Sequence, residues 1–313
     1  VIMVVTPASA HRDIAQSCAP HLHSGQIVVL NPGRTGGALE FRQILDRLGC
    51  AADVIVAETG TFVFASRSTG PAQARVFRRK NAVPLAALPA LHTGHVLETI
   101  CDAYPQFIPA LNVLHTSLDN MGAIFHPALA LLNAGWIERT RGEFQFYIDG
   151  VTDSTSRVLE VLDRERVTVA AALGVRARSA MRWLKDAYSA KGDTLYEVIL
   201  GNPGYRGIKA PRNMRHRYVF EDVPFSLVPL ISLGTQFGVD TWGADAMVRL
   251  ACVVHGTNYY ERGRTAEDMG LKGLRVSEVK RYVHEGKIKP IYAFAERGNG
   301  GSQQRAALSV EKT

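Results

Sequence analysis

Short apolar runs alternate with segments of helical apolar spacing along the first sixty residues. The runs 1–5, 26–30 and 53–57 are continuous and rich in valine and isoleucine, which is typical of parallel strands buried on both faces. The segments 8–23 and 38–48 lie between them, and 38–48 places its apolar residues at helical intervals. Three strand–loop–helix repeats predict a right-handed α/β sheet, whose ligands lie beyond the carboxyl ends of its strands.

A polar turn follows each predicted strand. Thr6-Pro7 follows the first strand, Asn31–Gly37 the second and Glu58–Thr61 the third. These turns are therefore the predicted ligand-binding edge of the sheet. The next segment, 74–89, has apolar residues on both sides of Asn81, which predicts a hairpin that extends the sheet.

The periodicity changes after Pro109. From Leu111 onward it is helical almost throughout, so we place a domain boundary near residue 110 and expect an all-α domain over 111–313. The closing segment 288–313 fits no pattern. The predicted helices are 111–125, 128–135, 155–173, 177–189, 224–237, 242–255 and 276–285.

Composition narrows the class of protein. The chain has 313 residues, 46% of them hydrophobic and 21% charged, which excludes a disordered tail. An excess of 36 basic over 29 acidic residues permits anionic ligands without demanding nucleic acid. No apolar run approaches the roughly 20 residues that cross a bilayer. Four scattered cysteines without a C-x-x-C pair suit a reducing cytoplasm and argue against a zinc ribbon or a disulfide framework.

The chain contains no glycine-rich G-x-G-x-x-G turn, the feature that lets a backbone approach a dinucleotide pyrophosphate. If the three repeats are the second half of a dinucleotide-binding sheet, the first half would need roughly 70 further residues upstream of Val1. We therefore expect the chain to lack the start of its cofactor domain.

The first candidate site lies between Leu111 and Pro127. Thr116, Asn120 and His126 recur there at about helical spacing and fall near one face. Pro127 disfavours helical geometry at His126, which predicts an imidazole at a helix break. Two readings remain open on these residues alone: a catalytic histidine, or polar groups that merely satisfy the backbone at a kink.

The second candidate is Asp222, which precedes Pro224 and an apolar helix. A carboxylate there is well placed to cap the helix, and position alone favours this structural role over a catalytic one. Arg217 is expected close to Asp222.

Basic residues accumulate over 206–217, which predicts either a solvated loop or an anion-binding surface. The basic residues of 75–80 are expected to protect a sheet edge from pairing. No histidine pair has a complete metal-ligand set, so no metal is predicted.

These residues together resemble a known family, the opine dehydrogenases of the octopine and nopaline dehydrogenase type. The resemblance covers most of residues 1 to 286, and each motif is weak alone whereas the combination is fairly specific. The residues that carry it are Asn31–Glu40 (N-P-G-R-T-G-G-A-L-E), Asn120 with His126-Pro127, Arg217-Tyr218 with Glu221–Pro224, and more weakly Gly263–Thr265 and Leu271–Leu274.

The resemblance implies a partial Rossmann-like parallel sheet domain, with 1–110 as the C-terminal half of a dinucleotide-binding domain, followed by an all-α domain. It implies that NADH or NADPH drives condensation of an α-keto acid, often pyruvate, with the amino group of an amino acid. Carried over, His126 would be the acid/base, Asp222 its partner and Arg217 the anchor of a substrate carboxylate.

We expect further contacts from two sets of residues. Thr116 and Asn120 are assigned to the substrate. The strand ends are assigned to the nicotinamide through Thr6, Pro7, Asn31 and Gly33.

Two alternative functions remain: another two-domain 2-keto or hydroxy acid reductase, and a non-catalytic protein that binds anions or nucleic acid through 206–217. The expected partners are small molecules, without nucleic acid or membrane, and a homodimer is one possible assembly.

Overall fold

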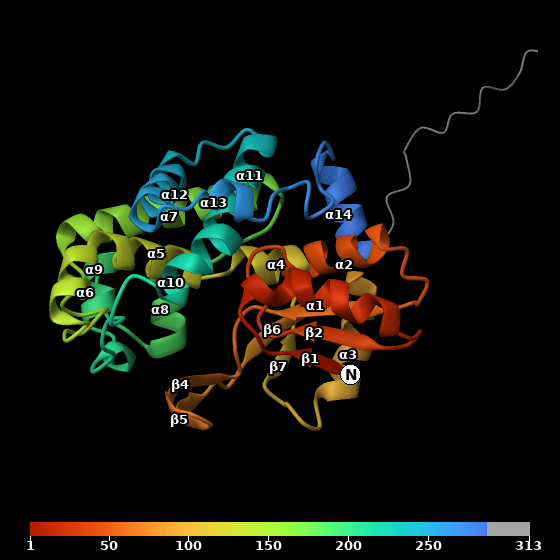
Figure 1. Ribbon diagram of the computed structural model, residues 1–313, viewed down its shortest axis with the longest axis horizontal. Helices are drawn as coiled ribbons and strands as arrows, with labels where there is room; N and C mark the ends of the chain where they lie inside the picture. The colour runs from red at the N-terminus through yellow and green to blue at the C-terminus, as the bar shows by residue number, and fades with distance from the viewer. Residues whose placement is uncertain (287–313) are drawn as a thin grey trace, which may run out of the picture.

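The computed structural model describes residues 1–286, and in its first part a five-stranded sheet is flanked by helices (Figure 1). Strands β1, β2 and β3 run parallel to one another, as predicted. Strand β6 is antiparallel to β3, and β7 is parallel to β6, so the sheet is mixed. The strands, in their order across the sheet, are β1 (Ile2–Val4), β2 (Ile27–Leu30), β3 (Ile55–Thr59), β6 (Val83–Leu88) and β7 (Phe107–Pro109).

Both faces of this sheet are buried, which explains its continuous apolar strands. Val28 and Leu30 face the core that contains α1 (His11–Cys18) and α2 (Gly37–Arg47). Ile27 and Val29 face a second core on the side of α3 (Thr93–Ile100). Alternate residues of one strand thus stabilise two helical layers.

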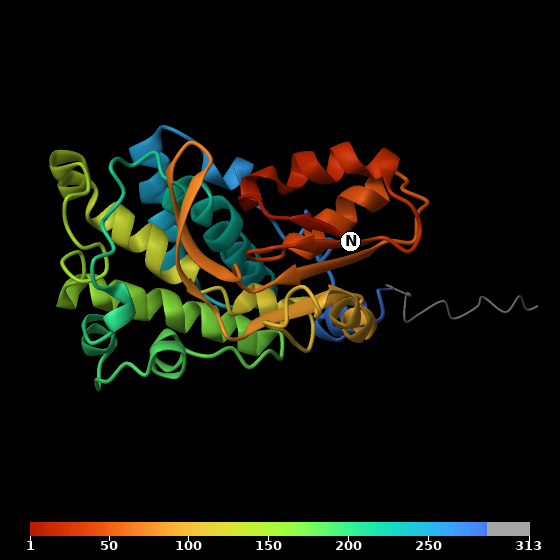
Figure 2. The ribbon, with the colours of Figure 1, turned by 90° about the horizontal axis from the view of Figure 1, so that it is seen from below.

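The predicted hairpin over 74–89 is wrong in its pairing. Strand β5 (Gln73–Arg79) pairs instead with β4 (Phe64–Gly70) in a separate two-stranded sheet, and Ala72 takes a left-handed conformation in the turn, φ 56°. The physical reason is burial: β6 is almost wholly buried and suits the central sheet, whereas Phe64 and Val76 are exposed. The β4–β5 hairpin projects from the sheet toward the helical part (Figure 2).

The sheet ends at Pro109, and from Val113 onward the structure is helical. Two of these helices pack against the sheet part: α4 (Val113–Leu118) against β3 and β6, and α14 (Val276–Glu285) against β6 and the turn that precedes α3 (Figure 1). The predicted tail 288–313 lies outside the described residues. The helices of this part are α4 (Val113–Leu118), α5 (Gly122–Leu132), α6 (Ala134–Thr140), α7 (Asp153–Ala172), α8 (Ala180–Tyr188), α9 (Leu195–Leu200), α10 (Arg217–Phe220), α11 (Val228–Phe237), α12 (Trp242–His255), α13 (Tyr259–Arg262) and α14 (Val276–Glu285).

The helix break predicted at His126 is wrong. The chain breaks earlier, between the end of α4 and the start of α5 at Gly122, and α5 continues through Pro127. Pro127 is the sixth residue of α5, so little more than one turn of the helix precedes it and must accommodate its ring. His126 therefore projects from a regular helix. Within residues 1–286, no helix combines the length and the apolar character needed to traverse a bilayer.

Candidate active site

A histidine and a carboxylate meet in the helical part of the molecule. His126 Nδ1 lies 2.8 Å from Asp222 Oδ2. Asp222 is fully buried, while 17% of the His126 side chain is exposed. Asp222 directly precedes a π-helical turn, Val223–Leu227, yet its side chain makes no capping hydrogen bond there. Its carboxylate is thus directed at the imidazole, and the capping role that position suggested is not observed.

Arg34 connects this pair to the sheet. It lies in the loop after β2 with a left-handed backbone, φ 59°. Its Nε donates to Glu221 Oε1 at 3.0 Å, and its Nη1 lies 3.3 Å from Asp222 Oδ1. Glu221 Oε1 also accepts the backbone N–H of Ala8, just after β1. Burial opposes the charge of Arg34, but Asp222 and Glu221 hold its pKa above the usual value.

The electrostatics fix how the imidazole is protonated. Burial raises the pKa of Asp222, but Arg34 and His126 outweigh it and hold this pKa below its usual range. Burial lowers the pKa of His126, and the charge of Asp222 offsets this in part. At neutral pH the ring is therefore neutral, with its Nδ1–H donated to Asp222. Nε2 is left with a lone pair that can accept a proton.

Tyr218 and Arg217, adjacent in α10, surround the histidine. The Tyr218 ring stacks on the imidazole with centroids 4.0 Å apart and planes 17° apart, which restricts the orientation of His126. Arg217 is 37% exposed, lies 3.6 Å from Glu221, and stands 5.8 Å from the centre of the Phe62 ring. Arg34 forms the direct ion pair with Asp222, whereas Arg217, which is expected close to Asp222, pairs with the adjacent Glu221. More than a third of the Arg217 side chain is therefore accessible.

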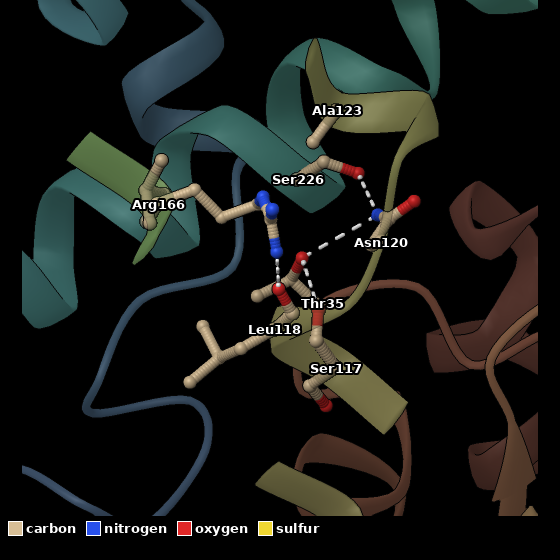
Figure 3. Close-up of a pocket in the computed structure, with 8 residues that line it drawn as sticks. Thr35, Ser117, Leu118, Asn120, Ala123, Arg166 and Ser226 are labelled. Atoms are coloured by element: carbon tan, nitrogen blue, oxygen red, sulfur yellow. Dashed lines mark hydrogen bonds between the residues drawn. The ribbon is translucent and has the colours of Figure 1, made fainter. Parts of the chain in front are cut away.

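Thr116 and Asn120 are buried and bonded to other protein groups. Thr116 donates to Glu58 Oε1 at 2.6 Å, and Asn120 donates to Ser226 Oγ at 2.9 Å. Asn120 borders a cavity of about 10 Å³ (Figure 3), which has room for one water molecule and none for a substrate. The structure therefore places both side chains in the scaffold between sheet and helices. Within residues 1–286, neither forms a hydrogen bond with His126 or Asp222.

The residues assigned to the cofactor lie after β1 and β2. Thr6 Oγ1 is buried and has no hydrogen-bond partner within residues 1–286, whereas Pro7 is exposed. Asn31 is buried, and its Oδ1 accepts from Thr59 at 2.9 Å. A Cβ on Gly33 would stand 2.7 Å from Glu58 Cβ, so only glycine fits there. Thr6 thus offers a free polar atom at the strand ends, while the other buried residues shape that edge.

The sequence reasoning missed three contributors to the site. Arg34 and Glu221 were both within the motifs quoted for the resemblance, but their opposite charges, 187 residues apart, gave no sign that they pair. Tyr218 also belongs to one of these motifs, but the sequence assigned it no role. The available signal was the arginine within N-P-G-R-T-G-G, because a cation in a loop after a strand lies at the ligand-binding edge.

Comparison with known proteins gives concordant matches. Residues 109–255 match the family model described as the alpha-helical domain of NAD/NADP octopine/nopaline dehydrogenase. The chain is 42% identical over 283 residues to an opine dehydrogenase of Arthrobacter sp. (strain 1C), covering 90% of this chain and 78% of that protein. It is 26% identical over 289 residues to the ocs protein of Agrobacterium tumefaciens (strain Ach5), with the same two shares.

Solved structures agree on the fold. An octopine dehydrogenase solved with NADH and L-arginine superposes with a TM-score of 0.74 at 19% identity, covering 93% of this chain and 79% of that one. A yersinopine dehydrogenase with NADP+ bound gives a TM-score of 0.65 at 15% identity, covering 90% and 77%. A sheet followed by a helical part is thus the fold that this chain shares with octopine dehydrogenase, and its helical part carries the histidine–carboxylate pair.

The chain belongs to the opine dehydrogenase family. The predictions of this family, of a Rossmann-like sheet followed by helices, and of an NAD(P)-dependent oxidoreductase are confirmed.

Proposed function

We propose that the protein condenses an α-keto acid such as pyruvate with the amino group of an amino acid, and that His126 moves the protons of this reaction. The observation that carries the proposal is the pair of His126 and a fully buried, ionised Asp222 at 2.8 Å. Formation and hydrolysis of an imine need proton transfers near neutral pH, for which an imidazole is suited. Asp222 fixes the tautomer and stabilises the imidazolium once it forms.

Arg217 is the proposed anchor of a substrate carboxylate. It lies one residue from Tyr218, whose ring stacks on the imidazole, and its side chain is partly accessible. A planar guanidinium can hold a carboxylate through two parallel hydrogen bonds. Arg34 is unsuited to this role because Glu221 and Asp222 already occupy it. The sequence assigns Thr116 and Asn120 to the substrate. Their hydrogen bonds to Glu58 and Ser226 favour a structural role instead.

The nicotinamide is proposed to lie at the carboxyl ends of β1 and β2, where Thr6 has a buried hydroxyl oxygen that finds no hydrogen-bond partner within residues 1–286. Pro7, Asn31 and Gly33 would border it. When bound there, NADH or NADPH supplies the hydride for the imine carbon. The chain's own task is to present the imine to that edge while His126 donates and accepts protons on the other side.

The test is oxidation of NADH and of NADPH, measured with each substrate alone and with both together, with the product identified by mass. Turnover that requires the amino acid, and a product whose mass corresponds to the condensed dicarboxylate, is expected. A keto acid reduced equally well without an amino acid would instead identify a hydroxy acid reductase. His126→Ala should abolish turnover and leave the circular dichroism spectrum unchanged. Substantial residual turnover would refute its role.

The protein is proposed to act in the cytoplasm on small molecules. Its cysteines Cys18, Cys50, Cys101 and Cys252 are all free thiols, which suits a reducing compartment. Binding to DNA with a steep salt dependence would contradict this proposal. A homodimer is the proposed assembly to test by sedimentation.

A further inference from the structure

Lys80, the residue after β5, brings a cation back to the ligand-binding edge of the sheet. Its backbone N–H donates to Val63 O at 2.9 Å, which closes the base of the β4–β5 hairpin. Its Nζ donates to Thr61 Oγ1 at 2.6 Å, and Thr61 follows the carboxyl end of β3. The sequence expectation that Lys80 merely protects a sheet edge therefore does not describe its side chain, which is half-buried and turned toward the strand ends.

The ammonium group of Lys80 has no acidic partner. No carboxylate forms an ion pair with it within residues 1–286, and Thr61 accepts only one of its three N–H bonds. Burial and the positive charge of Arg34 lower the pKa of Lys80 to about 8. At neutral pH it is still mainly charged. A half-buried cation with donors to spare is a ready binding group for an anion.

Lys80 and Arg217 approach neighbouring residues of one short segment. Thr61 contacts Lys80, and the next residue, Phe62, has its ring 5.8 Å from the Arg217 guanidinium. Arg217 in turn neighbours Tyr218, which stacks on His126. The segment after β3 therefore connects two cations, one from the sheet part and one from the helical part.

The proposed reaction demands two such cations. The keto acid and the amino acid each bring a carboxylate, and both carboxylates persist in the condensed product. Arg34 is engaged by two buried carboxylates, which leaves Arg217 and Lys80. We propose that Lys80 binds the second substrate carboxylate, with Thr61 positioning its ammonium group. This inference rests on the proposed function and extends it by a specificity-determining residue.

Lys80→Met, Lys80→Arg and the control Arg79→Met test the proposal. Arg79 is adjacent in sequence and exposed, so its replacement removes the same charge without touching Thr61. In Lys80→Met, the KM of either the keto acid or the amino acid should rise roughly 10- to 100-fold, the range of a lost charged hydrogen bond, while the other KM stays constant. Whichever KM rises identifies the carboxylate that Lys80 binds. Arg79→Met should change neither.

Two further measurements keep the outcome decisive. Binding of the dicarboxylate product, followed by calorimetry, should weaken by the same factor in Lys80→Met, and this readout needs no turnover. The affinity of the parent chain should fall above pH 8 as Lys80 loses its proton, and Lys80→Arg should remove that fall. Unchanged KM values and product affinity in a folded Lys80→Met would overturn the proposal. Absence of amino-acid-dependent turnover in the parent chain would instead count against the proposed function.

Discussion

Replacing Asp222 by asparagine removes one charge beside His126 and preserves the shape of the side chain. The two charges of the ionised pair would be about 4 Å apart, which corresponds to roughly 4 kcal/mol at an effective dielectric constant of 20. This attraction is an upper limit on the stabilisation that the carboxylate gives the protonated ring, and the 17% exposure of the ring reduces it. Its loss should therefore lower the pKa of His126 further below the usual value.

The assay is the pH dependence of kcat/KM for oxidation of the condensed product, in which His126 accepts a proton. Since the neutral ring is the active form in this direction, a lower pKa moves the acidic limb of the profile to lower pH. The plateau should fall by about 10²- to 10⁴-fold because the asparagine no longer fixes the Nδ1–H tautomer or stabilises the imidazolium. An unmoved limb with an intact plateau would refute this account of Asp222.

Glu221→Gln is the matched control. Glu221 is equally buried and pairs with the same Arg34, but no hydrogen bond joins it to His126. Both substitutions leave Arg34 with a single carboxylate, so both should lower the free energy of unfolding. Only Asp222→Asn should shift the limb. An equal shift in Glu221→Gln would mean that the net charge of the cluster, and not the direct contact, sets the pKa of His126.

The remaining predictions concern packing, pH and substrate affinity. Gly33→Ala forces a Cβ against Glu58 and should cost about 1 to 3 kcal/mol in urea unfolding, whereas Gly94→Ala meets open space in α3 and should not destabilise. Burial lowers the pKa of His11 to about 3, so the unfolded chain binds its proton first and stability falls as pH drops below 6.5. This loss, about 2 kcal/mol by pH 5, should be absent in His11→Leu, and equal acid sensitivity of the two chains would contradict it. Arg217→Lys loses the planar guanidinium and should raise the KM of one substrate at least 10-fold in steady-state kinetics. Unchanged KM values for both substrates would contradict this role of Arg217.

Local pattern was sufficient for much of the fold. The three parallel strands were predicted within two residues of their observed starts because burial on both faces requires unbroken apolar runs. The helix Trp242–His255 was predicted in full from its apolar spacing. His126 and Asp222 were singled out from sequence, but a kink explained His126 as well as catalysis did, and a cap explained Asp222 better. Only their resemblance to a family joined them into one site.

Tertiary structure decided everything that depends on which distant groups share a buried space. The sequence could not reveal that Arg34 pairs with Glu221 and Asp222, because an ion pair leaves no periodic trace in either partner's neighbourhood. The pairing of β6 also depended on the tertiary structure. Pairing with β3 buries β6 in the central sheet, whereas β5 pairs with β4 outside that sheet. The sequence by itself determined where strands and helices form, since burial of a face imposes its period on the chain. The structure alone determined which charges face one another, and therefore the pKa values on which the chemistry depends.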